Sequence, residues 1–304
     1  MVTQFTSDMA VNELFEFSKT LIDETYYWDN VPRDFKTLQY IIFAGMISYY
    51  GFEHIEEVAE VFNKVNFIFT REKMGDFLRK QPGLDRSTVE QLVKVGANAV
   101  FWQDIDFEGI QVKSAREKIY ASSYGNYSIA QQLEFLAHEV NHAVNSVNRK
   151  LFLENGRKYT RFGLCVNDVD QKLKKNLYLE ESFNVLQTGE IMDHILALSQ
   201  YDIKDPNIRK TLNSMKKDLQ NRRISSYTRT TPLVKPLYDD RHFNYVLKNR
   251  KIEGYISDIS DEFNCRVGSG SFDEMSNCLD KIYSDNTGSS ARRASNIVRQ
   301  YVRS

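Results

Sequence analysis

The first hundred residues repeat apolar positions at the spacing of α-helices. Ser7 is a suitable N-cap for a helix that passes through Phe15 and Leu21. The pattern predicts further helices and, from Val65 to Phe69, a short alternating strand. Those helices cover residues 35–50, 55–63, 73–80 and 87–97, with a turn at 82–83. Residues 1–98 are therefore predicted to form a mainly helical N-terminal region.

The pattern changes after residue 98. Alternating positions around Ile110 and again around Ile119 predict two or three strands before Ser123. Asn155-Gly156 lies between the segments 151–153 and 158–166 and predicts a β-hairpin. Further helices are predicted over residues 128–147, 177–198 and 273–283, with more helix to about 221, whereas residues 245–255 fit no single pattern.

These elements predict an α+β fold that is mainly helical and has a small sheet. The sheet is expected beside a helix over residues 128–147 and a second long helix over 177–198. Residues 99–284 are predicted to form one domain, and residues 285–304 a C-terminal tail. The tail carries arginines and no acidic residue after Gly288, and we interpret it as a solvated terminal helix rather than as a basic arm for an anionic partner.

The composition is typical of a soluble globular protein, with 41% hydrophobic and 27% charged residues among 304. A net charge of −1 creates no field that would attract nucleic acid or an anionic membrane, so neither is an expected partner. Cys165, Cys265 and Cys278 lie far apart and form no CxxC pair. This cysteine usage argues against a disulfide scaffold and fits a reducing cytoplasm.

The sequence gives no sign of export or of a membrane anchor. Residues 1–12 lack the apolar core of a signal peptide. The most apolar stretch, residues 40–52, is shorter than the roughly 20 residues that span a bilayer, and it predicts a buried helix. We expect a cytoplasmic protein, although export without an N-terminal signal would leave no mark of this kind.

The segment His138-Glu139-Val140-Asn141-His142 is the strongest chemical signal in the chain. Residues four apart project from one face of a helix, so both imidazoles can reach a single tetrahedral metal ion. Ser128 and Gln131 form a capping box that predicts where this helix begins. An aliphatic stripe on the opposite side is expected to pack into a core, and it comprises Ile129, Leu133, Leu136, Ala137, Val140, Val144 and Val147.

Glu139 lies between the two histidines and is offset from the predicted metal position. A carboxylate there can approach a water molecule without binding the metal itself. The metal would lower the pKa of that water, and Glu139 would accept its proton as the water attacks a carbonyl carbon. Because imidazole ligands must be neutral, metal affinity is expected to fall as the pH drops through about 6.5.

The run from Phe135 to Ala143 resembles the active-site helix of HExxH zinc peptidases, and the segment Leu179 to Asn184 resembles the second signature of their gluzincin branch. The resemblance implies Glu181 as the third ligand of a zinc ion, and a peptide or protein as the substrate. The separation of 39 positions between His142 and Glu181 resembles the long gap of lethal-factor-like peptidases and clostridial neurotoxin light chains. No third histidine follows at metzincin spacing.

The choice between the adjacent residues Glu180 and Glu181 also rests on a helical wheel. Neighbours on a helix point about 100° apart, so both are not expected to face one metal ion. Glu181 shares its side with Val185, Thr188, Met192 and Ile195, and that side is expected to face inward. Glu180 shares its side with Gln187, Glu190 and His194. The prediction is that Glu181→Ala lowers zinc occupancy sharply and that Glu180→Ala leaves it nearly intact.

Several other residues are weaker candidates. Gluzincins often add a side chain that stabilises the oxyanion, and Tyr227 is the choice here, ahead of Arg229, Tyr238 and His242. His54, His194 and His242 have no ligand spacing with each other and are interpreted as ordinary histidines. The run from Arg266 to Gly270 lacks the residues of a phosphate-binding loop and is interpreted as a plain loop.

The main hypothesis is a zinc endopeptidase that hydrolyses peptide bonds without a covalent intermediate. One alternative is a protein that keeps the metal and the fold but serves as a binding or regulatory module, which would have no need of Glu139. Another is a helical interaction protein in which the HExxH spacing is a coincidence. An extended substrate bound as an added strand at the sheet edge is compatible with the first hypothesis.

Overall fold

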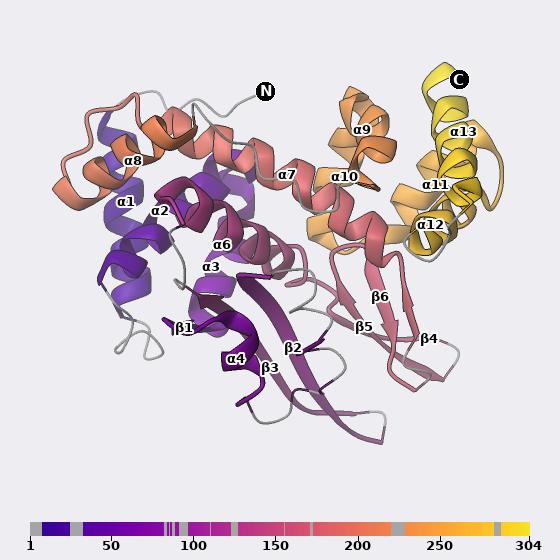
Figure 1. The fold of residues 1–304 in the computed structure, drawn as a ribbon, viewed down its shortest axis with the longest axis horizontal. Coiled ribbons are helices and arrows are strands. Elements are labelled where there is room, and N and C mark those ends of the chain that lie inside the picture. The colour runs from indigo at the N-terminus through magenta and orange to yellow at the C-terminus, as the bar shows by residue number, and fades with distance from the viewer. Residues whose placement is uncertain are drawn as a thin grey trace. The chain divides into compact units, whose positions relative to one another are not determined.

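A computed structural model of the protein describes residues 8–24, 33–81, 84, 86, 89–90, 97–109, 111–122, 127–154, 156–170, 173–219, 229–282 and 287–304. The chain divides into two compact units. The first comprises residues 1–140 and 189–224, and the second comprises residues 141–188 and 225–304. Figure 1 traces the helices and strands along the chain.

The first unit contains a three-stranded sheet and several helices. Strand β1 (Asn66–Thr70) pairs in parallel with β3 (Gln111–Ser122), and β2 (Ala99–Glu108) pairs with β3 in the antiparallel sense. Because β3 lies between them, β1 and β2 form the two edges of this sheet. The helices are α1 (Asp8–Asp23), α2 (Arg33–Tyr50), α3 (Ile55–Lys64), α4 (Met74–Leu78) and α8 (Pro206–Leu219), with a 3-10 turn η2 at Phe52–His54.

Helix α2 provides the apolar centre of the first unit. Every residue from Ile41 to Tyr50 is buried, which confirms the buried helix predicted from this stretch. Helix α2 lies very close to Ile195. A Cβ atom on Gly45 would lie only 2.3 Å from Cγ1 of that residue. No helix among the described residues is long and apolar enough to cross a membrane.

The second unit contains an antiparallel sheet of four strands in the order β4-β5-β6-β7. These strands are β4 (Leu151–Glu154), β5 (Arg157–Phe162), β6 (Cys165–Asp168) and β7 (Leu173–Lys175). The hairpin predicted around Asn155-Gly156 joins β4 to β5, although Asn155 itself lies outside the described residues. The segment predicted over residues 158–166 is divided between β5 and β6 by a turn at Gly163, whose φ is 55°. Strand β7 was not predicted.

Helices pack into an apolar core in the second unit. They are α9 (Thr231–Asp239), α10 (Arg241–Glu253), α11 (Ile256–Val267), α12 (Ser271–Lys281) and α13 (Ser289–Arg303). The ambiguous residues 245–255 belong mostly to α10. Helix α13 buries Ala294, Ile297, Val298 and Tyr301 and exposes its arginines, as expected of a solvated terminal helix.

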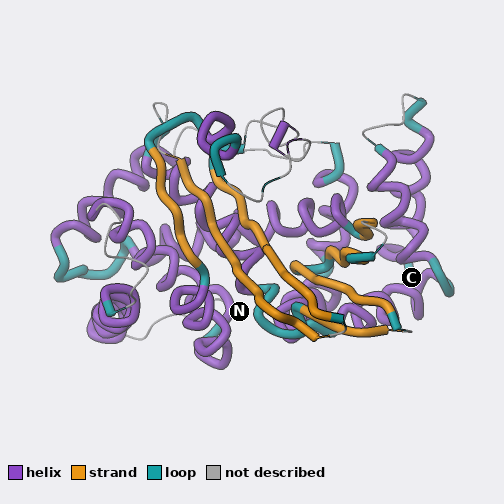
Figure 2. The backbone as a smooth tube through the Cα atoms, turned by 90° about the horizontal axis from the view of Figure 1, so that it is seen from below, coloured by secondary structure: helices purple, strands orange, loops and turns teal. Residues whose placement is uncertain are grey.

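Two long helices, α6 (Ile129–Val144) and α7 (Leu177–Leu198), run across the division of the chain into units. Both begin close to their predicted positions. Figure 2 colours the helices of the chain purple and its strands orange. The mainly helical α+β class predicted from the sequence is confirmed. Some predictions fall on residues that the structure does not describe, namely those for Ser7, residues 82–83 and most of the helix 87–97. The predicted domain limits at residues 98 and 284 stay predictions.

Candidate metal centre

The start of α6 is fixed by the capping box that the sequence predicts. The backbone N–H of Gln131 donates to Oγ of Ser128 at 3.3 Å, and the N–H of Ser128 donates to Oε1 of Gln131 at 3.0 Å. Leu133, Leu136 and Val140 of the aliphatic stripe are buried. The cap and the stripe together set the rotation of the helix, and therefore the direction in which His138 and His142 project.

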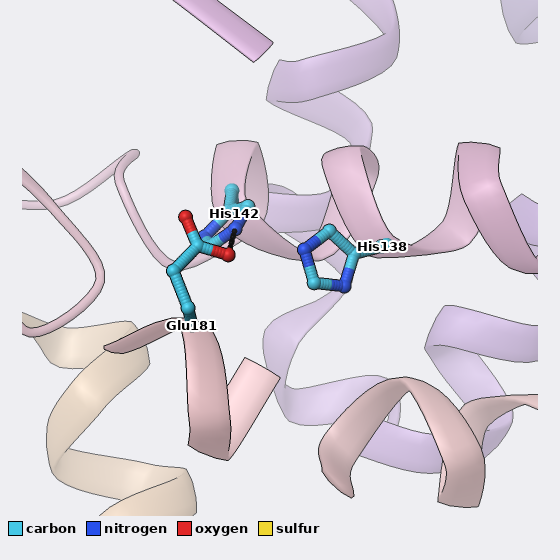
Figure 3. Close-up of side chains that lie close together, drawn as sticks. All are labelled: His138, His142 and Glu181. Carbon is cyan, nitrogen blue, oxygen red and sulfur yellow. Dashed lines mark hydrogen bonds and ion pairs between the residues drawn. The ribbon is translucent and has the colours of Figure 1, made fainter. Parts of the chain in front are cut away.

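His138, His142 and Glu181 converge on one space, as Figure 3 shows. One ring nitrogen of each histidine and one carboxylate oxygen of Glu181 all lie within 4.8 Å of one another. Nε2 of His142 lies 3.4 Å from Oε2 of Glu181. The structure thus brings together the three residues that the sequence analysis assigned as ligands.

Imidazole nitrogen and carboxylate oxygen, the donor types of this group, are among those that bind zinc. Zinc binds imidazole nitrogen and carboxylate oxygen at about 2.0–2.2 Å in a tetrahedral arrangement, which places the donor atoms roughly 3.3 Å apart. The separation of 3.4 Å between His142 and Glu181 matches this value. Three protein ligands leave a fourth position open, as in zinc sites that carry out catalysis. The group could therefore hold a metal ion.

Glu139 is anchored to the sheet of the first unit. The backbone N–H of Phe101, on the edge strand β2, donates to Oε2 of Glu139 at 2.6 Å. A hydrogen bond from an N–H group stabilises an ionised carboxylate, which is the form that accepts a proton. Glu139 is partly exposed and is not a member of the group that could hold a metal. This arrangement suits a base beside the ligands.

The burial of Glu180 on α7 was not predicted by the helical wheel. Its side chain is fully buried, whereas that of Glu181 keeps 13% exposure. Oε1 of Glu180 lies 2.9 Å from Nδ1 of His142 and 3.0 Å from Nζ of Lys251, and Oε2 accepts from the N–H of Leu164 at 2.8 Å. The wheel gave no sign of this burial because α7 has buried residues on every side near Glu180, including Leu179, Ser182, Asn184 and Met192, and therefore has no outward face there.

The charges around His142 change its protonation in the metal-free protein. Burial lowers the pKa of His142, but the carboxylates of Glu181 and Glu180 outweigh it and raise this pKa to about 10. Burial also tends to raise the pKa of Glu180, yet Lys251, His142 and the N–H of Leu164 hold it below its ordinary value. The pocket therefore favours a positive charge at the position where a metal cation would bind.

The remaining candidates lie in ordinary structural environments or outside the described residues. Tyr227 falls in the second category, so its predicted role stays a prediction. Tyr238 packs in the apolar core of the second unit, and Nε2 of His242 lies 3.2 Å from Oε1 of Glu262. Nδ1 of His194 forms a hydrogen bond with Oγ of Ser48 at 2.8 Å, and Nδ1 of His54 lies 3.6 Å from Oε2 of Glu57.

The run from Arg266 to Gly270 includes the end of α11 followed by a turn, in which Gly268 and Gly270 have positive φ. The predicted loop is thus confirmed only for its last residues.

No protein-family model, no curated protein and no solved structure matches this chain.

Proposed function

We propose that the protein is a zinc-dependent peptidase in which His138, His142 and Glu181 hold the metal and Glu139 is the general base. The observation that supports this proposal is the convergence of the three ligand side chains on one space. Glu139 follows His138 directly on the same helix. A site that served only to stabilise the fold would need the ligands but would not need this carboxylate.

Each residue of the site has a distinct part in the proposed reaction. The two imidazoles and the carboxylate of Glu181 bind the ion and leave one position open. A bound zinc ion supplies Lewis acidity, which lowers the pKa of water and polarises a carbonyl group. Glu139 accepts the proton from the attacking water and can return it to the leaving amine. The N–H of Phe101 keeps the Glu139 carboxylate in position for both transfers.

Strand β2 is the proposed binding surface for the substrate backbone. It lies at an edge of its sheet, and the N–H of Phe101 points away from β3 toward Glu139. An extended peptide that pairs with this edge would run beside Glu139. Recognition through backbone hydrogen bonds favours unfolded or flexible segments, because their N–H and C=O groups are free to pair.

The test is a comparison of wild type with Glu139→Gln. We expect the variant to bind about one zinc ion per chain, like wild type, and to lose at least a hundredfold in hydrolysis, since general-base catalysis contributes about 10²–10⁴-fold. Cleavage is measured by mass spectrometry after incubation with a library of denatured proteins. Asp193→Asn, which makes the same chemical change at an exposed position of α7, is the matched control.

The outcomes separate the proposal from its alternatives. Wild type that binds no zinc would support a helical protein with a coincidental motif. Wild type that binds zinc but cleaves nothing would support a metal-binding module without catalysis. Cleavage that Glu139→Gln retains at the wild-type rate would show that Glu139 is not the base.

A further inference from the structure

His142 belongs to a cluster of buried polar side chains within the second unit. His142, Arg161, Glu180, Gln187 and Lys251 are each no more than 3% exposed. Nζ of Lys251 donates to Oε1 of Gln187 at 2.7 Å and also contacts Glu180. Burying charged groups is costly unless they are paired and hydrogen-bonded. The free-energy cost of burying these groups suggests that they have a role beyond packing. Within the cluster, Glu180 contacts His142, one of the residues that could bind a metal.

The backbone around Glu180 is shaped to receive its carboxylate. A Cβ atom on Gly163 would lie 2.2 Å from the carboxyl carbon, so only glycine leaves room for this group. The next residue, Leu164, supplies the N–H that donates to Oε2. Nη1 of Arg161 donates to the carbonyl oxygens of Gly163 at 2.6 Å and of Lys251 at 3.3 Å. Arg161 thereby ties the turn after β5 to the end of α10, from which Lys251 projects.

The contact between Glu180 and His142 determines which ring nitrogen is free. An ionised carboxylate only accepts hydrogen bonds, so Nδ1 of His142 must carry a hydrogen to bond with Oε1. In a neutral imidazole the other nitrogen then keeps its lone pair. That nitrogen, Nε2, is the one that lies 3.4 Å from the ligand oxygen of Glu181. Glu180 therefore selects the tautomer and the ring orientation that a metal ion requires.

We propose that Glu180 is a positioning residue, which orients His142 for metal binding, and that Lys251 holds Glu180 in place. The inference rests on the metal site of the proposed function and assigns a role to a residue that does not bind the metal. Partners of this kind strengthen metal binding because they fix the ligand ring and raise its basicity. Adjacent residues of α7 thus act on one ion, with Glu181 as ligand and Glu180 as the support of another ligand.

A purely structural role for Glu180 is the competing explanation, since removing it would leave Lys251 buried without its counter-ion. Two variants separate the explanations. Glu180→Gln keeps an acceptor for Nδ1 but removes the charge. Glu180→Gln combined with Lys251→Met removes both buried charges, which is often neutral for stability. Asp193→Asn, on the same helix and exposed, is the control for the change from acid to amide.

Zinc affinity is measured by competition with a chromophoric chelator, and cobalt-substituted protein is followed by visible absorption. We expect zinc affinity to fall about 10–100-fold in Glu180→Gln and in the double variant, with altered cobalt bands in both. The double variant should recover the midpoint of urea unfolding that the single variant loses. Asp193→Asn should match wild type in every measurement.

Wild-type zinc affinity in Glu180→Gln, or its recovery in the double variant together with stability, would overturn the positioning role while leaving the proposed function intact. If Glu180→Gln does not fold, the double variant alone decides. Wild-type protein that binds no zinc would overturn the proposed function, and this inference with it.

Discussion

The interior around α2 and the interior around Glu180 are both closed to solvent, yet they consist of different kinds of side chain. From Ile41 to Ile47, α2 contributes residues that are apolar or glycine, each with negligible exposure. Around Glu180 the buried groups are charged or amide side chains, and among the described residues their polar atoms are mostly paired, with Nε2 of Gln187 as an exception. The stability of the first interior depends on how well apolar side chains fill its volume. The stability of the second depends on how well its charged and polar groups are paired. Mutations should therefore have different effects in the two regions.

Removing one charge from the polar interior should have the largest effect on stability. Lys251→Met leaves the carboxylate of Glu180 buried without its lysine partner, and we expect a loss of about 3–5 kcal/mol in the free energy of unfolding. Urea denaturation in the presence of a chelator measures this loss. Lys235→Met is the matched control, because Lys235 forms an exposed ion pair with Asp239 and should cost about 0–1 kcal/mol. A loss below 1 kcal/mol for Lys251→Met would show that the pair does not stabilise this interior.

In the apolar interior, replacing a buried polar side chain by an apolar one should have the opposite effect on stability. Gln39 on α2 is fully buried, and among the residues that the structure describes neither its amide oxygen nor its amide nitrogen has a hydrogen-bond partner. An unsatisfied buried polar group costs about 1–3 kcal/mol, so Gln39→Met, which keeps the length of the side chain, should stabilise the protein by a similar amount. Urea denaturation again measures the change. Destabilisation would show that Gln39 has a role that packing does not reveal.

This contrast also explains which parts of the molecule could be predicted from the sequence. The burial of α2 followed from an apolar run, and the start of α6 followed from local capping chemistry at Ser128 and Gln131. The ligand group followed from the spacing of His138 and His142 and from the signature that contains Glu181. Each of these signals lies within a short stretch of sequence.

The polar interior could not be predicted in this way, because its partners are distant along the chain. Glu180 and Lys251 are separated by 71 positions, and no local pattern marks either one as buried. The wheel placed Glu180 on a polar side of the helix, but its carboxylate is buried, and Lys251, Leu164 and His142 satisfy it. The predicted tolerance of zinc binding to Glu180→Ala is accordingly replaced by an expected loss of affinity.

The last prediction concerns how the polar interior responds to pH. In the metal-free protein, Glu181 and Glu180 outweigh burial and raise the pKa of His142 to about 10, against an ordinary value near 6.5. A raised pKa in the folded state adds stability that is fully present below about pH 6.5 and is lost as the pH rises toward about 10. Zinc must displace the same proton, so zinc affinity should rise about tenfold per pH unit, or about 1.4 kcal/mol, across this window.

An imidazole of ordinary pKa would instead contribute almost no pH dependence to the affinity above about 7.5. Calorimetry between pH 7.5 and 8.5, in buffers of different ionisation enthalpy, counts the protons released when zinc binds. We expect about one proton per zinc ion from His142, because a ring that is protonated in the free protein must be neutral as a ligand. In the variant that combines Glu180→Gln with Lys251→Met the released fraction should fall, since one of the two carboxylates that hold the proton is gone. A wild-type value near zero would mean that His142 is already neutral, and that the charges of this interior do not act on it as their distances imply.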